Sequence, residues 1–398
     1  MLRSNFKGAE LPLIFQFAQI ARNLSGVDGE IISLEQGQAD FQPPDAVKKE
    51  AQNFIKEKPV HYTTIDGLTE LKAKIAAKYQ RENNLDVKQE RISVGAGGSQ
   101  IIFEALAVTL SAGDEVIVPT PYWPSFVQGI QVNNGKPIFI ETALETGFKF
   151  DAQQLEHHIS SKTKWLILNS PGNPAGGYYS AEELHEICLV LDRYPNLLVM
   201  FDEIYEHMLF DNKVHQNILN IRPDLKERVL LVNGVSKSYS MTGWRIGYGI
   251  GPVELINAMK LYRSASTSSP SSVSQIAALK ALDTPLVDLK KQSRILEFRR
   301  NDVLRKLNDI NGLECGTPDG AMYVFPRCKQ LLGTRQPNRK KIVTDIDFCE
   351  YLIFNAGVST VPGTALGLPG YFRMNFALKE KVLDEAIARI TKAVSQLS

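Results

Sequence analysis

Four groups of polar residues each follow a short apolar run of this chain. They are Gly97-Gly98-Ser99, residues 169–174, residues 202–205 and residues 233–237. The runs before them are rich in Val, Ile, Leu and Phe, which is typical of buried strands in a mostly parallel sheet. Ligands bind such sheets beyond the carboxyl ends of the strands. The order therefore predicts that a glycine turn, an amide, a carboxylate with a phenol, and a lysine face one ligand.

The glycine turn is the group that would bind an anion. Gly97, Gly98 and Ser99 precede an apolar helix predicted over residues 100–110, and backbone N–H groups at a helix start attract phosphate. No Gly-Lys-Ser follows, as it would in a nucleotide-binding P-loop, and no later acidic residue completes a dinucleotide fingerprint. Taken alone, the turn could equally serve only to cap the helix.

The next two groups supply a carboxylate and a phenol. Asp202 ends an apolar run, where a carboxylate is unfavourable unless it is paired. It could cap a helix, but a protonated pyridine nitrogen is the better partner, since that ion pair keeps the ring electron-withdrawing. Tyr205 could reach the phenolic oxygen of the same ring, or could simply pack in the core.

The last group supplies an amine. Lys237 stands between an apolar run and residues 241–247, and lysines that form Schiff bases need surroundings that disfavour their charge. Arg245 follows shortly and offers a guanidinium for a phosphate, although it could equally form a structural ion pair. One ligand that needs all of these groups is pyridoxal phosphate.

Composition limits the classes of function. With 398 residues, 43% of them hydrophobic, the chain is long enough for two globular domains. A formal net charge of +1 gives no reason to expect nucleic acid or an anionic membrane as a partner. The four cysteines form no Cys-x-x-Cys pair. We therefore expect reduced thiols in a cytoplasmic chain, with no metal site and no disulfide framework.

The rest of the pattern describes the elements that must position these side chains. Helical and strand patterns alternate from about residue 45 to 285, whereas long charged helices and a strand-like pair near 321–325 and 371–376 follow. Residues 11–18 form an amphipathic segment, and the last helix carries an apolar stripe that predicts packing on a core. We expect three parts, namely an N-terminal segment (1–44), a large cofactor-binding domain (45–285) and a small domain (286–398).

Several motifs together carry a resemblance to a known family. They are residues 236–247, 169–176 and 202–206, and residues 113–116 with 121–123. In this order they resemble the aspartate aminotransferase superfamily, which are class I and II (fold-type I) pyridoxal-phosphate enzymes, over nearly the whole chain. The resemblance implies an α/β fold whose large domain holds a mostly parallel seven-stranded sheet covered by helices. A smaller α+β domain would form from the N-terminal segment and the C-terminal third.

The resemblance also implies a role for each matching residue at the cofactor. Lys237 would hold it as a Schiff base and carry the proton at the substrate's α-carbon, and Asp202 would pair the pyridinium. Asn173 and Tyr205 would bond the phenolic oxygen, and Tyr122 would stack on the ring. The phosphate would be held by Gly97, Gly98, Ser99, Ser236 and Arg245.

Three further residues would serve the substrate and the assembly. Arg373 matches the arginine that clamps the substrate α-carboxylate, a bidentate task suited to a guanidinium. Gly37 would lend a backbone amide to that carboxylate, beside Asn173. Tyr62 falls where the family sends a tyrosine into the neighbouring subunit's phosphate site, which implies a homodimer with shared active sites.

The side chain of the substrate is left open by the sequence. One subgroup of aspartate aminotransferases carries a lysine where Ser99 stands, and another uses an arginine near Ser264. Neither basic residue is present here, although Arg263 is adjacent and could supply the charge. The pocket could then accept neutral or aromatic amino acids as well as acidic ones. Aromatic residues expected near it are Phe15, Tyr122, Trp123 and Tyr323.

Two other functions remain compatible with the pattern. The same scaffold supports pyridoxal-phosphate lyases and synthases, and transamination is favoured because the family's members most often perform it. A non-enzymatic ligand-sensing protein is the other alternative. Such proteins usually carry an added DNA-binding domain, for which this sequence leaves no room, and an inert relative would be free to lose Lys237 or Asp202. We therefore expect an aminotransferase that acts on an L-amino acid and a 2-oxo acid.

Overall fold

The structure is a computed structural model that describes residues 11–24 and 31–398. Its largest feature is a seven-stranded sheet with the strand order β2-β8-β7-β6-β5-β3-β4. The strands are β2 (Ile92–Gly95), β3 (Glu115–Thr120), β4 (Lys136–Glu141), β5 (Thr163–Asn169), β6 (Leu198–Asp202), β7 (Val229–Gly234) and β8 (Gly247–Ile250). Neighbouring strands are parallel except at β8, which runs antiparallel to β2 and β7. The carboxyl ends of β5, β6 and β7 therefore lie side by side.

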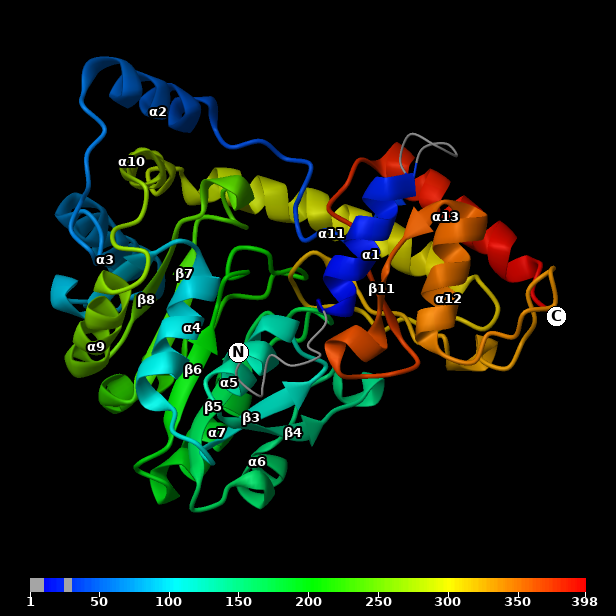
Figure 1. Ribbon diagram of the computed structural model, residues 1–398, viewed down its shortest axis with the longest axis horizontal. Coiled ribbons are helices and arrows are strands. Elements are labelled where there is room, and N and C mark those ends of the chain that lie inside the picture. Colours follow the sequence, from blue (N-terminus) through cyan, green and yellow to red (C-terminus); the bar gives the residue numbers. More distant parts are fainter. Residues whose placement is uncertain (1–10, 25–30) are drawn as a thin grey trace, which may run out of the picture.

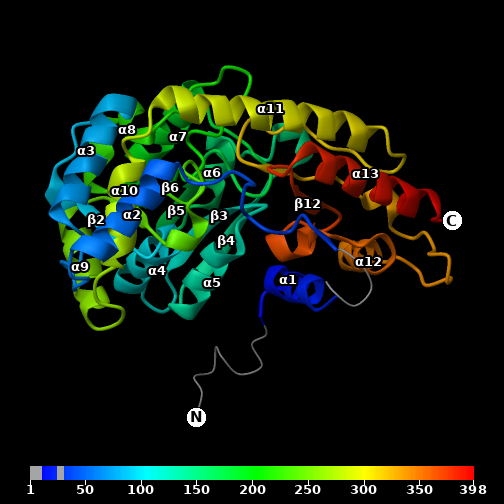
Figure 2. The ribbon, with the colours of Figure 1, turned by 90° about the horizontal axis from the view of Figure 1, so that it is seen from above.

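Helices cover both faces of this sheet. In β5, Trp165 and Ile167 pack into one apolar cluster, whereas Leu166 and Leu168 pack into another, as the alternation of side chains along a strand requires. Figure 2 shows helices on either side of the strands. One face carries α4 (Gly98–Thr109), α5 (Pro124–Val132) and α9 (Val253–Ser264). The other carries α2 (Asp45–Glu57), α3 (Thr69–Asn83), α6 (Ala152–His158), α7 (Ala181–Arg193), α8 (Ile218–Ile221) and α10 (Ser272–Ala281).

A second apolar core forms from residues near the two ends of the chain. Its short strands pair as β1 with β10, and as β11-β12-β9. The elements are α1 (Leu13–Leu24), β1 (Ile32–Ser33), β9 (Tyr323–Val324), α12 (Asp345–Tyr351), β10 (Val358–Ser359), β11 (Val361–Pro362), β12 (Phe372–Asn375) and α13 (Glu380–Ser395). Figure 1 shows α1 beside β11.

One long helix joins the two cores. Helix α11 (Leu286–Asn308) contributes Leu289 to the core under the sheet and Leu296 to the second core, and Figure 2 shows it running across both parts. The domain boundary expected at residue 285 stays a prediction, because α11 belongs to both cores. Among the described residues, no helix is both long and apolar enough to cross a membrane.

The predicted α/β fold is confirmed, and so are most of its expected elements. The strands found from apolar runs are present, and the stripe of the last helix lies buried in the second core. Strands β4 and β8 were missed. Strand β4 lies at the edge of the sheet and is partly exposed, and β8 has the sequence Gly-Tyr-Gly-Ile, so neither has a strong apolar pattern. Within the predicted N-terminal segment, residues 1–10 and 25–30 lie outside the described part of the chain.

Candidate active site

A cavity of about 420 Å³ opens beyond the carboxyl ends of the central strands. Asn169 and Asp202, the last residues of β5 and β6, lie in its wall, and Lys237 follows β7 into it. The second core closes the other side with Tyr323 and Arg373. This volume suits a cofactor or a small ligand, and the cavity lies where parallel sheets bind ligands.

Asp202 is a buried carboxyl without an ion pair among the described residues. Its Oδ1 accepts a hydrogen bond from the backbone N–H of Ile204 at 3.2 Å. Burial raises the pKa of Asp202 to about 7, against the opposing effects of that hydrogen bond and of Lys237. A carboxyl in this state is set to receive a cationic group from a ligand, because such a partner would restore its ionised form.

Lys237 projects from a tight turn formed by residues 236–241. The turn is closed by backbone bonds from Ser240 N to Lys237 O and from Met241 N to Ser236 O, each 3.1 Å long. The Lys237 ammonium donates to the carbonyl oxygen of Gly37, and its Nζ lies 5.7 Å from the centre of the Tyr205 ring. The amine therefore reaches across the cavity from the sheet to the N-terminal segment.

One end of the cavity is built to bind an anion. Helix α4 starts at Gly98 without a side-chain cap, and Ser99 and Thr242 line the cavity beside it. Arg245 donates to the carbonyl oxygens of Thr242 at 2.9 Å and Ala96 at 3.3 Å, and no described carboxylate pairs with it. An uncapped helix N-terminus next to an unpaired guanidinium favours a phosphate.

Gly97 shapes this end although it does not line the cavity. Its φ of +91° is in the region that favours glycine. A Cβ at this position would lie 2.5 Å from Nη2 of Arg245. Any larger residue would therefore displace the guanidinium, so Gly97 allows Arg245 its place next to the start of α4.

Arg373 provides a second unpaired guanidinium, at the opposite end. It comes from β12 and is buried, with Nη1 donating to Oδ1 of Asn173 at 2.9 Å and Nη2 donating to the Glu35 carbonyl at 2.6 Å. The guanidinium lies over the Tyr323 ring at 4.3 Å, and its Nε has no partner. All these partners are neutral and no described carboxylate pairs with it, so the site lacks the anion that a buried arginine requires.

Two tyrosines and a carboxyl complete the wall around Arg373. The hydroxyl oxygens of Tyr205 and Tyr323 lie 3.1 Å apart. Burial opposes ionisation of Tyr323, but the cations Lys237 and Arg373 hold its pKa below the usual value. Burial raises the pKa of Glu35, whose carboxyl oxygens have no hydrogen-bond partner. The end of the cavity that holds Arg373 therefore favours an anionic ligand, because no carboxylate of the described chain pairs with this guanidinium.

Most residues that were expected at the site lie around this cavity. They are Gly37, Gly98, Ser99, Asn173, Asp202, Tyr205, Ser236, Lys237, Arg245 and Arg373. Phe15, Trp123 and Tyr323 also line it, as expected from the sequence. Sequence reasoning missed Glu35 and Thr242. Thr242 lies inside the motif that contains Lys237 and Arg245, which was a signal, whereas Glu35 had none.

Besides Gly97, two expected site residues do not line the cavity. Tyr122 does not line the cavity; its ring stacks on Phe139 with centres 5.4 Å apart and contacts Gly367. Trp123 occupies the cavity wall in its place, because the chain turns there into α5 and neighbouring side chains point in different directions. Tyr62 is 92% exposed on the surface of this chain, outside its own cavity.

Arg263 does not supply a charge to the cavity. It is fully buried, and its Nε donates to the Glu104 carboxylate at 2.9 Å. Nη2 pairs with the same carboxylate, and Nη1 donates to backbone carbonyls of Ile65 and Val94. All three nitrogens are used, so Arg263 is a structural ion pair. The neighbouring Ser264 hydroxyl bonds back to the Leu261 carbonyl and does not line the cavity either.

Comparison with known proteins gives one consistent result. Residues 29–390 match the family model described as aminotransferase class I and II. A probable aspartate/prephenate aminotransferase of Rickettsia felis is 44% identical over 374 residues, which is 94% of this chain and 91% of that protein. The crystal structure of an aspartate aminotransferase from Rhizobium meliloti covers 100% of both chains at 41% identity, with a TM-score of 0.96. That of Thermus thermophilus aspartate aminotransferase with maleate has a TM-score of 0.91, at 32% identity and 99% coverage of both.

Proposed function

The chain belongs to the class I and II aminotransferases and is a transaminase, and from this premise we propose that it uses pyridoxal phosphate to move an amino group between an L-amino acid and a 2-oxo acid. The observation that carries the proposal is that Lys237 and Arg373 line the same cavity. An amine reaches across it from the sheet, and a buried guanidinium without a carboxylate partner lies opposite. An amino acid brings both groups that these residues need.

The residues around the cavity fit the phosphate, the ring nitrogen and the ring face of the cofactor. The start of α4, with Ser99, Ser236 and Arg245, would hold the phosphate. Asp202 would pair with the ring nitrogen, since burial raises its pKa to about 7 until a cation arrives. Trp123, in the cavity wall, would stack on the ring in place of Tyr122.

The phenolic oxygen would be bound by Asn173 and Tyr205. Oδ1 of Asn173 already accepts from Arg373, so the amide nitrogen is the group left to donate. Tyr205 lies against Tyr323 and would donate its hydroxyl proton. Asn173 would thus connect the cofactor with the arginine that binds the substrate.

Lys237 is the residue that would do the proton chemistry. Pyridoxal phosphate supplies an aldehyde that condenses with amines and a ring that withdraws electrons from the bonds at the α-carbon. Lys237 Nζ would remove the proton from the substrate's α-carbon and deliver it to the cofactor, acting first as a general base and then as a general acid. Arg373 and the backbone of Gly37 would hold the α-carboxylate, so that the α-hydrogen stays within reach of Nζ.

The substrate side chain would meet a mostly uncharged surface. Lys237 and Arg245 are committed to the cofactor and Arg373 to the α-carboxylate, and no other described cation lines the cavity. Ile14, Phe15 and Trp123 line it as well. We therefore propose that neutral and aromatic amino acids are accepted along with acidic ones, unless a second subunit supplies a charge. The names of the relatives, aspartate and aspartate/prephenate aminotransferases, are compatible with such a range.

A homodimer with shared sites is the proposed assembly, in the cytoplasm. Tyr62 is 92% exposed, and Val60, Leu261 and Tyr262 also expose apolar surface. In a dimer Tyr62 would reach the phosphate in the partner's cavity. The four cysteines are free and buried, which fits a reducing compartment.

The first experiment tests the cofactor and its lysine. The purified protein should absorb visible light, and borohydride reduction followed by peptide mapping should place the cofactor on Lys237. Lys237→Ala should lose the reducible linkage and nearly all transamination. Lys213→Ala is the control, because that lysine pairs with Asp319 outside the cavity at 3.0 Å. A Lys237→Ala protein that transaminates at the wild-type rate would overturn the proposal.

A matrix of amino donors against 2-oxo acids then tests the substrate range. Comparable rates for aspartate and for aromatic and neutral donors are expected. A strong preference for aspartate over every neutral donor would contradict the broad range and would point to a cation contributed by the partner subunit.

A further inference from the structure

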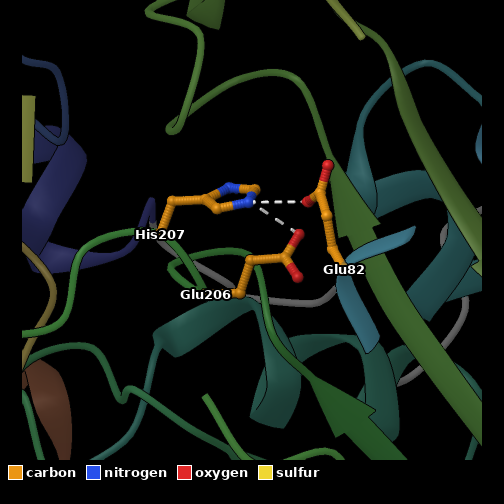
Figure 3. Close-up of side chains that lie close together, drawn as sticks. All are labelled: Glu82, Glu206 and His207. Atoms are coloured by element: carbon orange, nitrogen blue, oxygen red, sulfur yellow. Dashed lines mark hydrogen bonds and ion pairs between the residues drawn. The ribbon is translucent and has the colours of Figure 1, made fainter. Parts of the chain in front are cut away.

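A group of ionisable side chains lies behind the cavity wall, outside the site described so far. Glu82 at the end of α3 meets Glu206 and His207 from the turn after β6, as Figure 3 shows. Nε2 of His207 lies 2.9 Å from the Glu82 carboxylate, and its Nδ1 lies 3.9 Å from that of Glu206. All three side chains are largely buried.

The group is not a metal site, although carboxylates and an imidazole are suitable ligands. Lys78, whose side chain is 1% exposed, lies 2.5 Å from both Glu206 oxygens and 3.6 Å from Glu82. Its ammonium holds the place between the carboxylates that an ion would take. Despite burial, Lys78 and the histidines His207 and His215 hold the pKa of Glu206 at about 2. The chain itself therefore supplies the cation that partners these carboxylates.

The other edge of the imidazole contacts the turn that carries Lys237. Nδ1 of His207 lies 2.9 Å from the hydroxyl oxygen of Ser238, the residue next to Lys237. The His207 ring also meets the Tyr239 ring edge-on, with centres 6.2 Å apart. The network reaches β7 as well, since Nδ2 of Asn233 donates to Glu206 at 2.7 Å. The same network thus joins α3, the turn after Asp202 and the turn that carries the amine.

Among the described residues, His207 is the one side chain of the charged group that hydrogen-bonds to this turn, through the Ser238 hydroxyl. The Glu82 pKa is lowered, with His207 and Lys78 as the stabilising partners against the effect of burial, so the carboxylate can only accept and Nε2 must donate. This fixes the ring, and Nδ1 on its opposite edge then fixes the Ser238 hydroxyl. Within the part of the chain that the structure describes, the turn is otherwise held by the backbone bonds within residues 236–241, by the bond from Lys237 to Gly37, and by the packing of Tyr239 and Met241 in the core under the sheet.

We propose that His207 is a positioning residue for the transamination reaction. It holds the turn that carries Lys237, and thereby keeps the amine in place relative to Asp202 and Tyr205. The inference rests on the proposed function of Lys237. Removing the ring takes away the side-chain support at Ser238 without touching cofactor or substrate. A displacement of about 1 Å at a reacting group can slow a reaction on the order of 100-fold. The effect is therefore expected in kcat, with KM nearly unchanged.

Two substitutions separate the two hydrogen bonds of the ring. In His207→Asn the amide takes the place of Nδ1, so the bond to Ser238 is kept and the one to Glu82 is lost. In His207→Gln the amide takes the place of Nε2, so the reverse holds. His207→Phe removes both, and should lower kcat about 10- to 100-fold. His207→Asn should recover most of this loss, and His207→Gln little of it.

A double-mutant cycle with Ser238→Ala identifies the bond itself. If the imidazole acts through the hydroxyl, Ser238→Ala and His207→Phe should each lower kcat, and the double variant should be no slower than His207→Phe alone. Ser238→Ala also keeps the test decisive if His207→Phe fails to fold. Additive effects, or wild-type kcat in Ser238→Ala, would overturn the proposal.

Spectroscopy and a second histidine separate positioning from general stability. The pH titration of the cofactor's visible absorbance reports the surroundings of the Lys237 nitrogen, and its midpoint should shift in His207→Phe and Ser238→Ala. His215→Asn is the control, because His215 pairs with Glu203 at 2.8 Å in the same buried region but does not touch the turn. It should lower the melting temperature and leave kcat and the titration as in the wild type. An equal shift in His215→Asn would refute a specific role for His207.

The wild-type protein distinguishes failure of this inference from failure of the proposed function. A wild type without cofactor absorbance or transamination would overturn the proposed function. A wild type with both, alongside His207 and Ser238 variants that match it in kcat and titration, would overturn the positioning role only.

Discussion

Replacing Asp202 by Asn should make the cofactor-free protein more stable relative to wild type as the pH rises. In the folded chain burial raises the pKa of Asp202 to about 7, whereas an unfolded aspartate titrates near 3.9. The folded state therefore binds the proton more tightly. The stabilisation from that proton is complete below about pH 4 and is lost as the pH rises to about 7. The amide in Asp202→Asn carries no charge at any of these pH values, so the variant lacks this loss.

The size of the effect follows from the difference between the two pKa values. About three units correspond to about 4 kcal/mol of unfolding free energy at a pH above both values. At pH 5 the folded carboxyl is still protonated, and only about 1.5 kcal/mol of that loss has developed. The difference in unfolding free energy between Asp202→Asn and the wild type should therefore rise by about 2.5 kcal/mol, in favour of the variant, from pH 5 to pH 8.

Urea unfolding of the cofactor-free proteins at both pH values measures this difference. Asp211→Asn is the control, because the Arg300 guanidinium lowers the pKa of Asp211. The Asp211 carboxyl is then ionised in both the folded and the unfolded chain at both pH values, so the stability of this variant relative to wild type should be the same at pH 5 and pH 8. With cofactor bound, Asp202→Asn should slow transamination by orders of magnitude, since an amide does not keep the ring nitrogen protonated. Equal pH dependence of the wild type and Asp202→Asn would refute the argument and show that a cation already pairs with Asp202.

Three further predictions concern the substrate and the assembly. Arg373→Lys should raise KM for donors and acceptors alike by about 10- to 100-fold, since a point charge replaces a bidentate fork. Arg300→Lys, at a buried bidentate arginine far from the cavity, should lower stability and leave KM unchanged; a KM effect in both would count against a carboxylate clamp. Mixed dimers of Tyr62→Phe and Lys237→Ala subunits should recover activity through one intact site, and no recovery from weak parents would argue against shared sites. Burial raises the pKa of Glu35, so KM should rise as Glu35 ionises beside Arg373 at higher pH. Glu35→Gln should abolish this rise, and identical KM–pH profiles would contradict it.

Much of the site could be predicted because it depends on strand ends. The apolar runs before Asn169, Asp202 and Lys237 identify parallel strands, and the carboxyl ends of such strands lie together whatever the rest of the fold does. The glycine turn at Gly97 was found for a similar reason, since a helix start has a local signature. Arg373, from a distant part of the chain, was found only through resemblance to a family.

The parts that could not be predicted depend on which way a side chain points. Nothing in the local sequence distinguishes Tyr122 from Trp123, yet one packs on Phe139 and the other lines the cavity. Arg263 was a candidate for substrate binding until the structure placed it against Glu104, in the core. In both cases the packing of elements far apart in the sequence decides the direction.

The sequence by itself thus determined the fold class, the strand ends and the chemical types of the groups that meet there, because these depend on periodicity and on local turns. The tertiary structure alone decided which charges remain unpaired. Arg245 and Arg373 have no carboxylate partner among the described residues, whereas Arg263 and Lys78 are paired in the interior. Pairing depends on distances between separate elements. For a buried charge, those distances decide whether it stabilises the fold or awaits a ligand.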